Sequence, residues 1–342
     1  MAPLLPMLAK ASPAIPDAEP EKWWFEPKWD GFRCIVFRDG DEILLGSRND
    51  KPLTRYFPEL LGPLKATLPE RCVVDGEIVI AGADGLNFDA LQQRIHPAES
   101  RINRLALETP ASFVAFDLMA LGDQNLMDTP LAQRRALLER ALADSVASIH
   151  LTPGTYDRSI AQDWFSRFEG AGLDGVMAKD PTGTYQPNKR VALKIKHLRT
   201  ADCVVAGFRE HKDGSGPGSL LLGLWDDDGR LLHLGVASSF SVARRKELRE
   251  ELAPHVVSDL SHHPWGQWPG GGGSRWNVGK DLSFTALDPE LVAEVAYERV
   301  DNGRFRHSAR FKRWRPDRSG ESCTFEQLEV VPAIELKQVF GS

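Results

Sequence analysis

The sequence of 342 residues contains no apolar run that approaches the roughly 20 residues needed for a membrane-spanning helix. Its first sixteen residues carry no basic side chain before Lys10 and are interrupted by four prolines, which is unlike a secretory signal peptide. The four cysteines are scattered and form no C-x-x-C pair: Cys34, Cys72, Cys203 and Cys323. This pattern argues against a disulfide framework and against a structural zinc site. We therefore expect a cytoplasmic protein with no membrane anchor.

The sequence also lacks a net positive charge, since 42 Lys and Arg face 48 Asp and Glu, for a net charge of −6. The cations are nevertheless concentrated. Residues 179–199 contain six Lys or Arg and one acid, and residues 299–318 contain eight and two. Basic stretches on an acidic body predict local phosphate binding. Charge alone leaves two ordinary solvated surfaces equally open.

The first half of the sequence predicts an α+β domain. Two alternating runs flank Asp39-Gly40 within residues 31–47, which is a strong signal for a β-hairpin. Further strands are expected at 72–80, 112–120, 174–179 and 191–197, and helices at 129–143 and 159–171. Because strands often follow one another directly, antiparallel sheets with flanking helices are favoured over a doubly wound parallel sheet.

The second half has a different pattern. Short strands are expected at 202–209, 219–225, 230–237, 292–299 and 308–314, with one helix at 241–252. This composition is compatible with a small Greek-key barrel such as an OB-fold. The Gly-rich stretch within 261–280 lacks the Lys-Ser/Thr ending of a phosphate-binding loop and is interpreted as a plain loop. We place the domains at 1–199 and 200–342.

One segment has the composition of a nucleophilic site. In Glu26-Pro-Lys28-Trp-Asp30-Gly-Phe-Arg33, a lysine lies beside a Gly turn, with two acids and an arginine close by. It resembles the K-x-D-G-x-R signature of the covalent nucleotidyltransferases, which comprise DNA ligases, RNA ligases and mRNA-capping enzymes. The resemblance implies that Lys28 attacks the α-phosphate of a nucleotide, for which its amine must be deprotonated. Glu26 and Arg33 are then expected to bind the nucleotide.

Three further segments resemble motifs of this superfamily, in the same order. Ser47-Arg48-Asn49 resembles the motif whose arginine holds the 5′-phosphate of a nick. Asp75-Gly76-Glu77 resembles the motif whose glutamate serves the ribose or the metal, and the aromatic ring of Phe116 corresponds to the one that stacks on adenine.

The remaining motifs lie in or just before the two basic stretches. Asp174-Gly175 followed by Lys179 resembles E-G-x-x-x-K, whose acid binds Mg²⁺ or Mn²⁺. Lys194 and Lys196 resemble the K-x-K motif that holds the α-phosphate, and on a strand they would share one face. Arg315-Pro-Asp317-Arg318 resembles the R-x-D-K motif that orients the pyrophosphate leaving group. The expected DNA contacts are Arg48, Lys179, Arg304 and Arg306.

Most of these segments have a plain structural alternative when taken alone, such as a core aromatic for Phe116 or solvated acids for Glu77 and Asp174. Seven matches in order, from residue 26 to residue 318, favour the functional interpretation. Two positions depart from the pattern. Asp174 stands where Glu is usual and is one methylene shorter, and Arg318 stands where Lys is usual.

The combined motifs resemble ATP-dependent DNA ligases, and most closely the bacterial end-joining type. In that type the ligase module stands alone (DNA ligase C) or is fused to other domains (DNA ligase D), and this chain matches the stand-alone form. The resemblance implies a monomer that uses ATP and Mg²⁺ or Mn²⁺ to seal nicked double-stranded DNA in repair, with a Ku-type end-binding protein as a candidate partner. Two alternatives stay open, namely an RNA ligase or capping-type enzyme and a non-catalytic DNA-binding relic of the fold.

Overall fold

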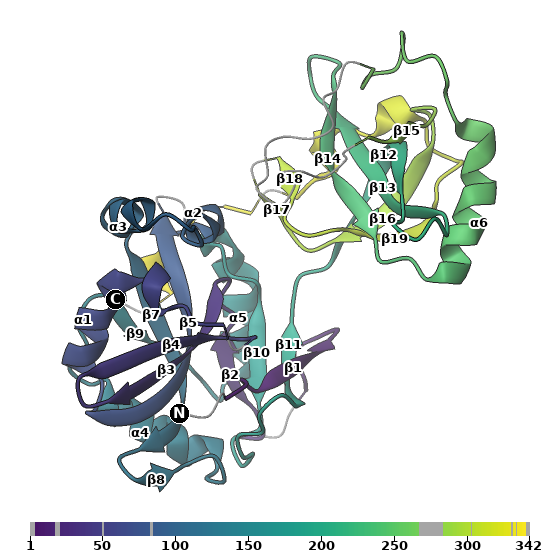
Figure 1. Ribbon diagram of the computed structural model, residues 1–342. Helices are drawn as coiled ribbons and strands as arrows, with labels where there is room; N and C mark the ends of the chain where they lie inside the picture. The colour runs from purple at the N-terminus through teal and green to yellow at the C-terminus, as the bar shows by residue number, and fades with distance from the viewer. Residues whose placement is uncertain are drawn as a thin grey trace. The chain divides into compact units, whose positions relative to one another are not determined.

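The computed structural model describes residues 4–17, 21–49, 51–82, 85–266, 283–301, 303–329, 331–332 and 334–339. The chain divides into two compact units (Figure 1), one made of Met1–Lys196 with Val331–Ser342 and the other of His197–Val330. The predicted boundary at 199/200 lies three residues later than this division. The assignment of 331–342 to the second domain is corrected, because the backbone N–H of Ile334 donates to the carbonyl of Gly170 (3.1 Å) in the first unit.

A large sheet forms the centre of the first unit. Its strands run in the order β4-β3-β5-β7-β8 and neighbouring strands are antiparallel. The bounds are β3 (Phe32–Asp39), β4 (Glu42–Ser47), β5 (Arg71–Gly82), β7 (Ala111–Leu121) and β8 (Gln124–Asn125), with β6 (Gly85–Leu86) on β5 and β9 (Ile149–Leu151) parallel to β7. The hairpin predicted at Asp39-Gly40 is confirmed, and Gly40 takes the positive φ of 59° that the tight turn requires.

Helices flank this sheet and contribute apolar side chains to its core. They are α1 (Pro58–Thr67), α2 (Phe88–Gln93), α3 (Glu99–Glu108) and α4 (Leu131–Ala141). One apolar cluster joins side chains of β3, β5 and β7 to Leu60 and Leu64 of α1 and Leu138 of α4. It holds these helices against the sheet.

A second, four-stranded sheet completes the first unit, in the order β1-β11-β10-β2. The bounds are β1 (Leu8–Ser12), β2 (Trp24–Pro27), β10 (Val176–Lys179) and β11 (Arg190–Ile195). Helix α5 (Arg158–Arg167) and the 3-10 helix η2 (Phe168–Ala171) precede β10, and Ala161 of α5 packs with Phe25, Val176 and Ile195 of the sheet. The predicted fold class of antiparallel sheets with flanking helices is confirmed for this unit.

The second unit is a small closed barrel. Its strands are β12 (Arg199–Glu210), β13 (Pro217–Trp225), β14 (Leu231–Ser238), β16 (Val292–Tyr297) and β19 (Arg310–Trp314), hydrogen-bonded in the order β14-β13-β12-β16-β19. A parallel bridge between Ala237 and Ala309 brings the two end strands together. Helix α6 (Val242–Leu252) connects β14 to the later strands. This is the topology of an OB-fold, as the sequence predicts.

The minor elements are short. The strands are β15 (Thr285–Ala286), β17 (Val300–Asp301) and β18 (Arg304–Phe305), and the 3-10 helices include η1 (Thr54–Tyr56), η3 (Ala253–His255), η5 (Gly320–Ser322), η6 (Phe325–Gln327) and η7 (Leu336–Gln338). Most of the predicted Gly-rich loop, from residue 267 on, lies outside the described residues. No helix in the described ranges is long and apolar enough to span a bilayer.

Candidate active site

Lys28 lies where the chain passes from the small sheet to the large one, between the end of β2 and the start of β3. Two backbone hydrogen bonds tie this loop to the turn before β10, from Lys28 N–H to Gly175 O (2.8 Å) and from Asp174 N–H to Lys28 O (2.9 Å). A side chain at Gly31 would overlap the carbonyl of Ile78, so glycine lets the loop lie directly against β5. The loop is therefore held on both sides.

The Lys28 ammonium meets Asp174, its Nζ lying 2.7 Å from Oδ2. Lys196, just after β11, contacts the same oxygen at 2.9 Å. Burial alone would raise the pKa of Asp174, but the two ammonium groups lower it below its usual range, so the carboxylate is ionised. Gly175 has a φ of 130° and lies against the backbone of Ile195, a position open only to glycine. The structure therefore brings Lys28, Asp174 and Lys196 together.

Arg33 and Glu77 are opposite each other on β3 and β5. The guanidinium of Arg33 donates to both carboxylate oxygens of Asp75, each at 2.6 Å, and Asp75 is fully buried. Burial raises the pKa of Glu77 to about 7, although the nearby cations of Arg33 and Lys28 lower it. Glu77 thus lies close to Lys28. The nearby cations only partly offset the effect of burial on its negative charge.

Phe116 of β7 is buried, yet it belongs to none of the apolar clusters formed by the described residues. Its ring lies instead among cations, with the guanidinium carbon of Arg33 at 4.4 Å and Nζ of Lys179 at 4.8 Å from its centroid. Phe113, three residues earlier, occupies the core position. This placement favours a ligand platform over a core aromatic for Phe116.

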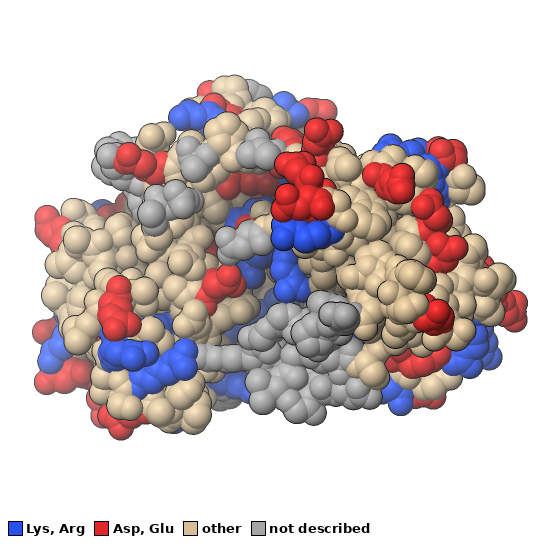
Figure 2. All heavy atoms as spheres, turned by 90° about the horizontal axis from the view of Figure 1, so that it is seen from above, with Lys and Arg blue, Asp and Glu red and all other residues tan. Residues whose placement is uncertain are grey.

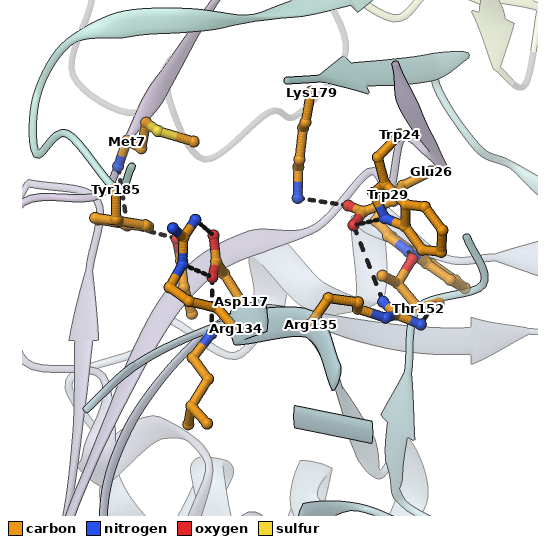
Figure 3. A network of polar contacts seen from close by, with 12 residues as sticks. Met7, Trp24, Glu26, Trp29, Asp117, Arg134, Arg135, Thr152, Lys179 and Tyr185 are labelled. Atoms are coloured by element: carbon orange, nitrogen blue, oxygen red, sulfur yellow. Dashed lines mark hydrogen bonds and ion pairs between the residues drawn. The ribbon is translucent and has the colours of Figure 1, made fainter. Parts of the chain in front are cut away.

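Glu26 lies almost completely buried in a polar network (Figure 3). Its carboxylate accepts from the indole N–H of Trp24 (2.8 Å), pairs with Nζ of Lys179 (2.5 Å) and lies 3.9 Å from Arg135. The predicted DNA contact by Lys179 is therefore wrong. The side chain is only 8% exposed and points towards Glu26, so its cation is covered and paired inside the unit.

Sequence reasoning missed Tyr185, which lies between two of the recognised motifs. Its hydroxyl donates to Oδ2 of Asp75 (2.6 Å) and accepts from the backbone N–H of Met7 (2.9 Å). Tyr185 thus adds a third hydrogen bond to the carboxylate that holds Arg33. No periodicity marks this residue, because its role depends on a partner 110 positions away.

The remaining predicted site residues lie on β11, just after β4 and in the second unit. Lys194 is opposite Met177 across β10 and β11, and Arg48 is exposed just after β4. In the second unit, Arg315 donates to both oxygens of Asp202 (2.9 and 2.8 Å) and pairs with Asp317. Arg304 is exposed.

The predicted DNA contact by Arg306 is also corrected. Its side chain is 9% exposed and lies 3.4 Å from Asp301, so the cation is covered and paired inside the unit. Arg304, two residues earlier, keeps an exposed side chain. Of the two neighbouring arginines, only Arg304 retains the exposure that a DNA contact requires.

Many other cations of the two basic stretches also have acidic partners. The pairs include Arg199 with Glu329, Arg299 with Asp301, Arg313 with Glu294 and Arg318 with Asp202. Figure 2 shows basic and acidic side chains interspersed over the face it draws. The linear charge runs therefore overstate the number of cations available to a polyanion.

Comparison with known families agrees with this arrangement. Residues 6–196 match the model of the ATP dependent DNA ligase domain, and residues 213–318 match that of the ATP dependent DNA ligase C terminal region. The chain belongs to the ATP-dependent DNA ligase family. The two matches correspond to the two units, with the Lys28 cluster in the first and Arg315 in the second.

Individual relatives support the assignment. This ligase is 56% identical to DNA ligase C of Mycobacterium tuberculosis (strain ATCC 25618 / H37Rv), over 99% of this chain and 97% of that protein. It is 50% identical to DNA ligase C1 of Mycolicibacterium smegmatis, over 98% and 97%. The solved ligase domain of M. tuberculosis LigD has a TM-score of 0.50 and 28% identity, covering 94% of this chain and 98% of that one. The predicted activity as an ATP-dependent DNA ligase is confirmed.

Proposed function

We propose that this ligase seals nicks between a 5′-phosphate and a 3′-hydroxyl in double-stranded DNA through an AMP group carried on Lys28. The observation that carries the proposal is the contact of the Lys28 ammonium with Asp174 (2.7 Å) beside Lys196. A lysine held at a fixed loop next to a second cation and two carboxylates is the arrangement that attack on a nucleotide α-phosphate needs.

The reaction has three in-line phosphoryl transfers. After the Lys28 ammonium loses one proton to solvent, its Nζ forms a bond to the α-phosphorus of ATP, the bond to pyrophosphate breaks, and the nitrogen releases a second proton to give the phosphoramidate. The AMP then moves to the 5′-phosphate of the nick and frees the lysine. Finally the 3′-hydroxyl attacks that activated phosphate and expels AMP. Positioning and charge neutralisation supply most of the catalysis in such transfers.

The neighbouring residues have separate tasks in this scheme. Phe116 offers its ring to the adenine. Glu26 pairs with Lys179, the cation beside that ring. Lys194 and Lys196 contact the α-phosphate. Arg33 is held rigid by Asp75, so it can meet the ribose or a phosphate without losing side-chain entropy. In the second unit, Arg315 and Asp317 orient the pyrophosphate, and the exposed Arg48 and Arg304 contact the DNA backbone.

The donor set near Lys28 suits a hard divalent cation. Glu77 and Asp174 are both carboxylates, and the described residues contain no group of three or more His, Cys, Asp or Glu that could hold a metal alone. Mg²⁺ is commonly bound through one or two carboxylates together with waters and substrate phosphates. We assign Mg²⁺ or Mn²⁺ to Glu77 and Asp174, where it would neutralise charge on the nucleotide phosphates.

Replacement of Lys28 tests the proposal directly. Lys28→Ala should abolish the protein–AMP adduct formed with labelled ATP, yet still seal a nick supplied already adenylylated, because the last step does not use the lysine as nucleophile. Normal labelling of the variant would remove Lys28 from the mechanism. No adduct on the wild-type protein would instead support a non-catalytic DNA-binding relic, and labelling by GTP in place of ATP would support a capping-type enzyme.

We also propose a role in bacterial DNA repair. A supporting relative is the multifunctional non-homologous end joining DNA repair protein LigD of M. tuberculosis, 32% identical over 92% of this chain and 39% of that protein. A Ku-type end-binding protein is then the candidate partner. Joining of linear DNA ends with and without purified Ku tests this, and equal rates in both reactions would argue against the partnership.

A further inference from the structure

The segment that returns to the first unit, residues 331–339, is named here the return segment. It follows the described end of the second unit and packs on the backbone of η2, where Ile334 N–H donates to Gly170 O (3.1 Å). A side chain at Gly170 would overlap the carbonyl of Pro332, so the two backbones lie in direct contact. Figure 1 shows this yellow segment on the first unit.

The return segment also contributes to an apolar cluster. Val339 is only 2% exposed, and Ile334 and Leu336 pack partly buried against the same group. The other buried members come from five separate parts of the first unit: Trp29, Val79, Leu86, Val114, and the stretch with Phe168, Ala171 and Leu173. A segment distant in sequence thus closes a core that the first unit would otherwise leave incomplete.

Two members of this cluster are the immediate neighbours of the reacting pair. Trp29 follows Lys28, and Leu173 precedes Asp174. The two loops are joined by backbone hydrogen bonds of 2.8 and 2.9 Å and by the 2.7 Å contact of Lys28 with Asp174. Trp29 is fixed further by its indole N–H, which donates to Thr152 Oγ1 (2.8 Å). The cluster therefore packs behind the loops that carry the nucleophile and its carboxylate.

We propose that Val339 and Gly170 are positioning residues for the reaction of Lys28, acting through the packing of the return segment behind Trp29 and Leu173. This inference rests on the proposed function, since it takes Lys28 as the nucleophile. The observed contacts of the return segment are with the backbone of Gly170 and with the apolar cluster behind the two loops. The segment therefore affects the geometry of attack and leaves nucleotide binding unchanged.

Val339→Ala tests the proposal in the full-length protein. The rate of protein–AMP formation at saturating ATP should fall about tenfold, because small misplacement of a reacting group is costly, while the apparent KM for ATP stays within about twofold. Val339→Ile should restore the rate by refilling the cluster. Thermal melting measured in parallel gives the temperature range in which every variant is folded, and the rates are compared there.

Val36→Ala is the matched control. Val36 is fully buried in a different apolar cluster of the first unit, the one between β3, β5, β7 and helices α1 and α4, which contains neither Trp29 nor Leu173. The same two methyl groups are removed, so its melting temperature should fall while its rate at saturating ATP is retained. An unchanged rate in Val339→Ala, or an equal loss in Val36→Ala, would overturn the proposal.

A second pair of variants keeps the test decisive if Val339→Ala does not fold. Gly170→Ala displaces the return segment without removing an apolar group, and it should also slow labelling at saturating ATP. Gly62→Ala is its control, because nothing lies within 4 Å of the added methyl group on α1. Labelling of Gly170→Ala at the wild-type rate would contradict the inference. Absence of labelling in the wild-type protein would instead refute the proposed function.

Discussion

Glu77 is a carboxyl group that the fold keeps partly protonated near neutral pH. Burial raises its pKa from 4.5 to about 7. Such a group favours folding while it is protonated, so its contribution to the free energy of unfolding falls as the pH rises from about 4.5 to about 7 and is constant above that range. In the proposed function, ionised Glu77 would bind the metal. Ionisation of Glu77 therefore lowers the free energy of unfolding of the metal-free protein.

Glu77→Gln should remove this pH dependence. Between pH 4.5 and pH 7 the wild-type protein should lose up to about 3 kcal/mol that the variant does not lose, from a shift of about 1.4 kcal/mol per pKa unit. Urea unfolding at several pH values measures the difference. Parallel stability curves for the two proteins would contradict the buried, poorly compensated state of Glu77.

Lys179 forms a buried ion pair with Glu26, and the contribution of this pair to stability can be measured without DNA. Lys179→Met should lower the free energy of unfolding by about 3 kcal/mol, because it leaves the buried carboxylate of Glu26 without its 2.5 Å partner. Lys179→Met with Glu26→Gln should recover part of that loss, and a double-mutant cycle from urea unfolding measures the coupling. Additive losses would mean that the pair is not coupled.

At the residue scale, Lys28, Asp174 and Lys196 could be predicted from the sequence because each belongs to a short motif that contains the reactive residue type itself. It could not decide exposure. Lys179 and Arg306 have the same formal charge as Lys189 and Arg304, but the first two are covered and paired while the other two are exposed. Pairing depends on residues distant in sequence, such as Glu26 for Lys179, and no local pattern encodes it.

At the scale of elements, long alternating strands were predicted well and short or irregular elements were not. The hairpin of β3 and β4, the strands β5 and β7 and the helices α4, α5 and α6 all lie at the expected positions. Helix α1 was missed, since it contains Gly62 and Pro63, residues that disfavour helices. Its buried Leu60 and Leu64 stabilise it through tertiary packing, which is invisible in local propensity.

The segment after β19 positions Arg315 by ion pairs with Asp202 of β12 and with Asp317. Arg315→Ala should slow reaction of Lys28 with ATP by about 100-fold, the usual cost of removing one donor to a developing charge. Sealing of a pre-adenylylated nick should fall much less, because no pyrophosphate leaves in that step. Rapid-quench assays of the two reactions give the comparison, and equal losses would indicate a folding or DNA-binding defect.

At the scale of the whole molecule, charge pairing changes the expectation for DNA binding. Net charge is −6, and ion pairs within each unit take up several of the cations in the two basic stretches. Five cations of these stretches are exposed and have no acidic partner in the described part of the chain: Lys189, Arg190, Arg304, Arg310 and Lys312. Pairing thus leaves a smaller set of cations for phosphates than the sequence count suggests.

If these five cations meet phosphates, log K for DNA binding should fall with log[salt] at a slope of about −4.5, since each contact contributes about −0.9. Arg310→Gln should make the slope shallower by about one unit. Arg313→Gln on the same strand is the matched control, because Arg313 is 60% exposed but already pairs with Glu294 at 2.7 Å. Its slope should stay that of the wild-type protein, and Lys28 labelling should be unchanged in both variants. Equal effects of the two substitutions in a salt titration would show that ion pairing does not decide which cations the DNA uses.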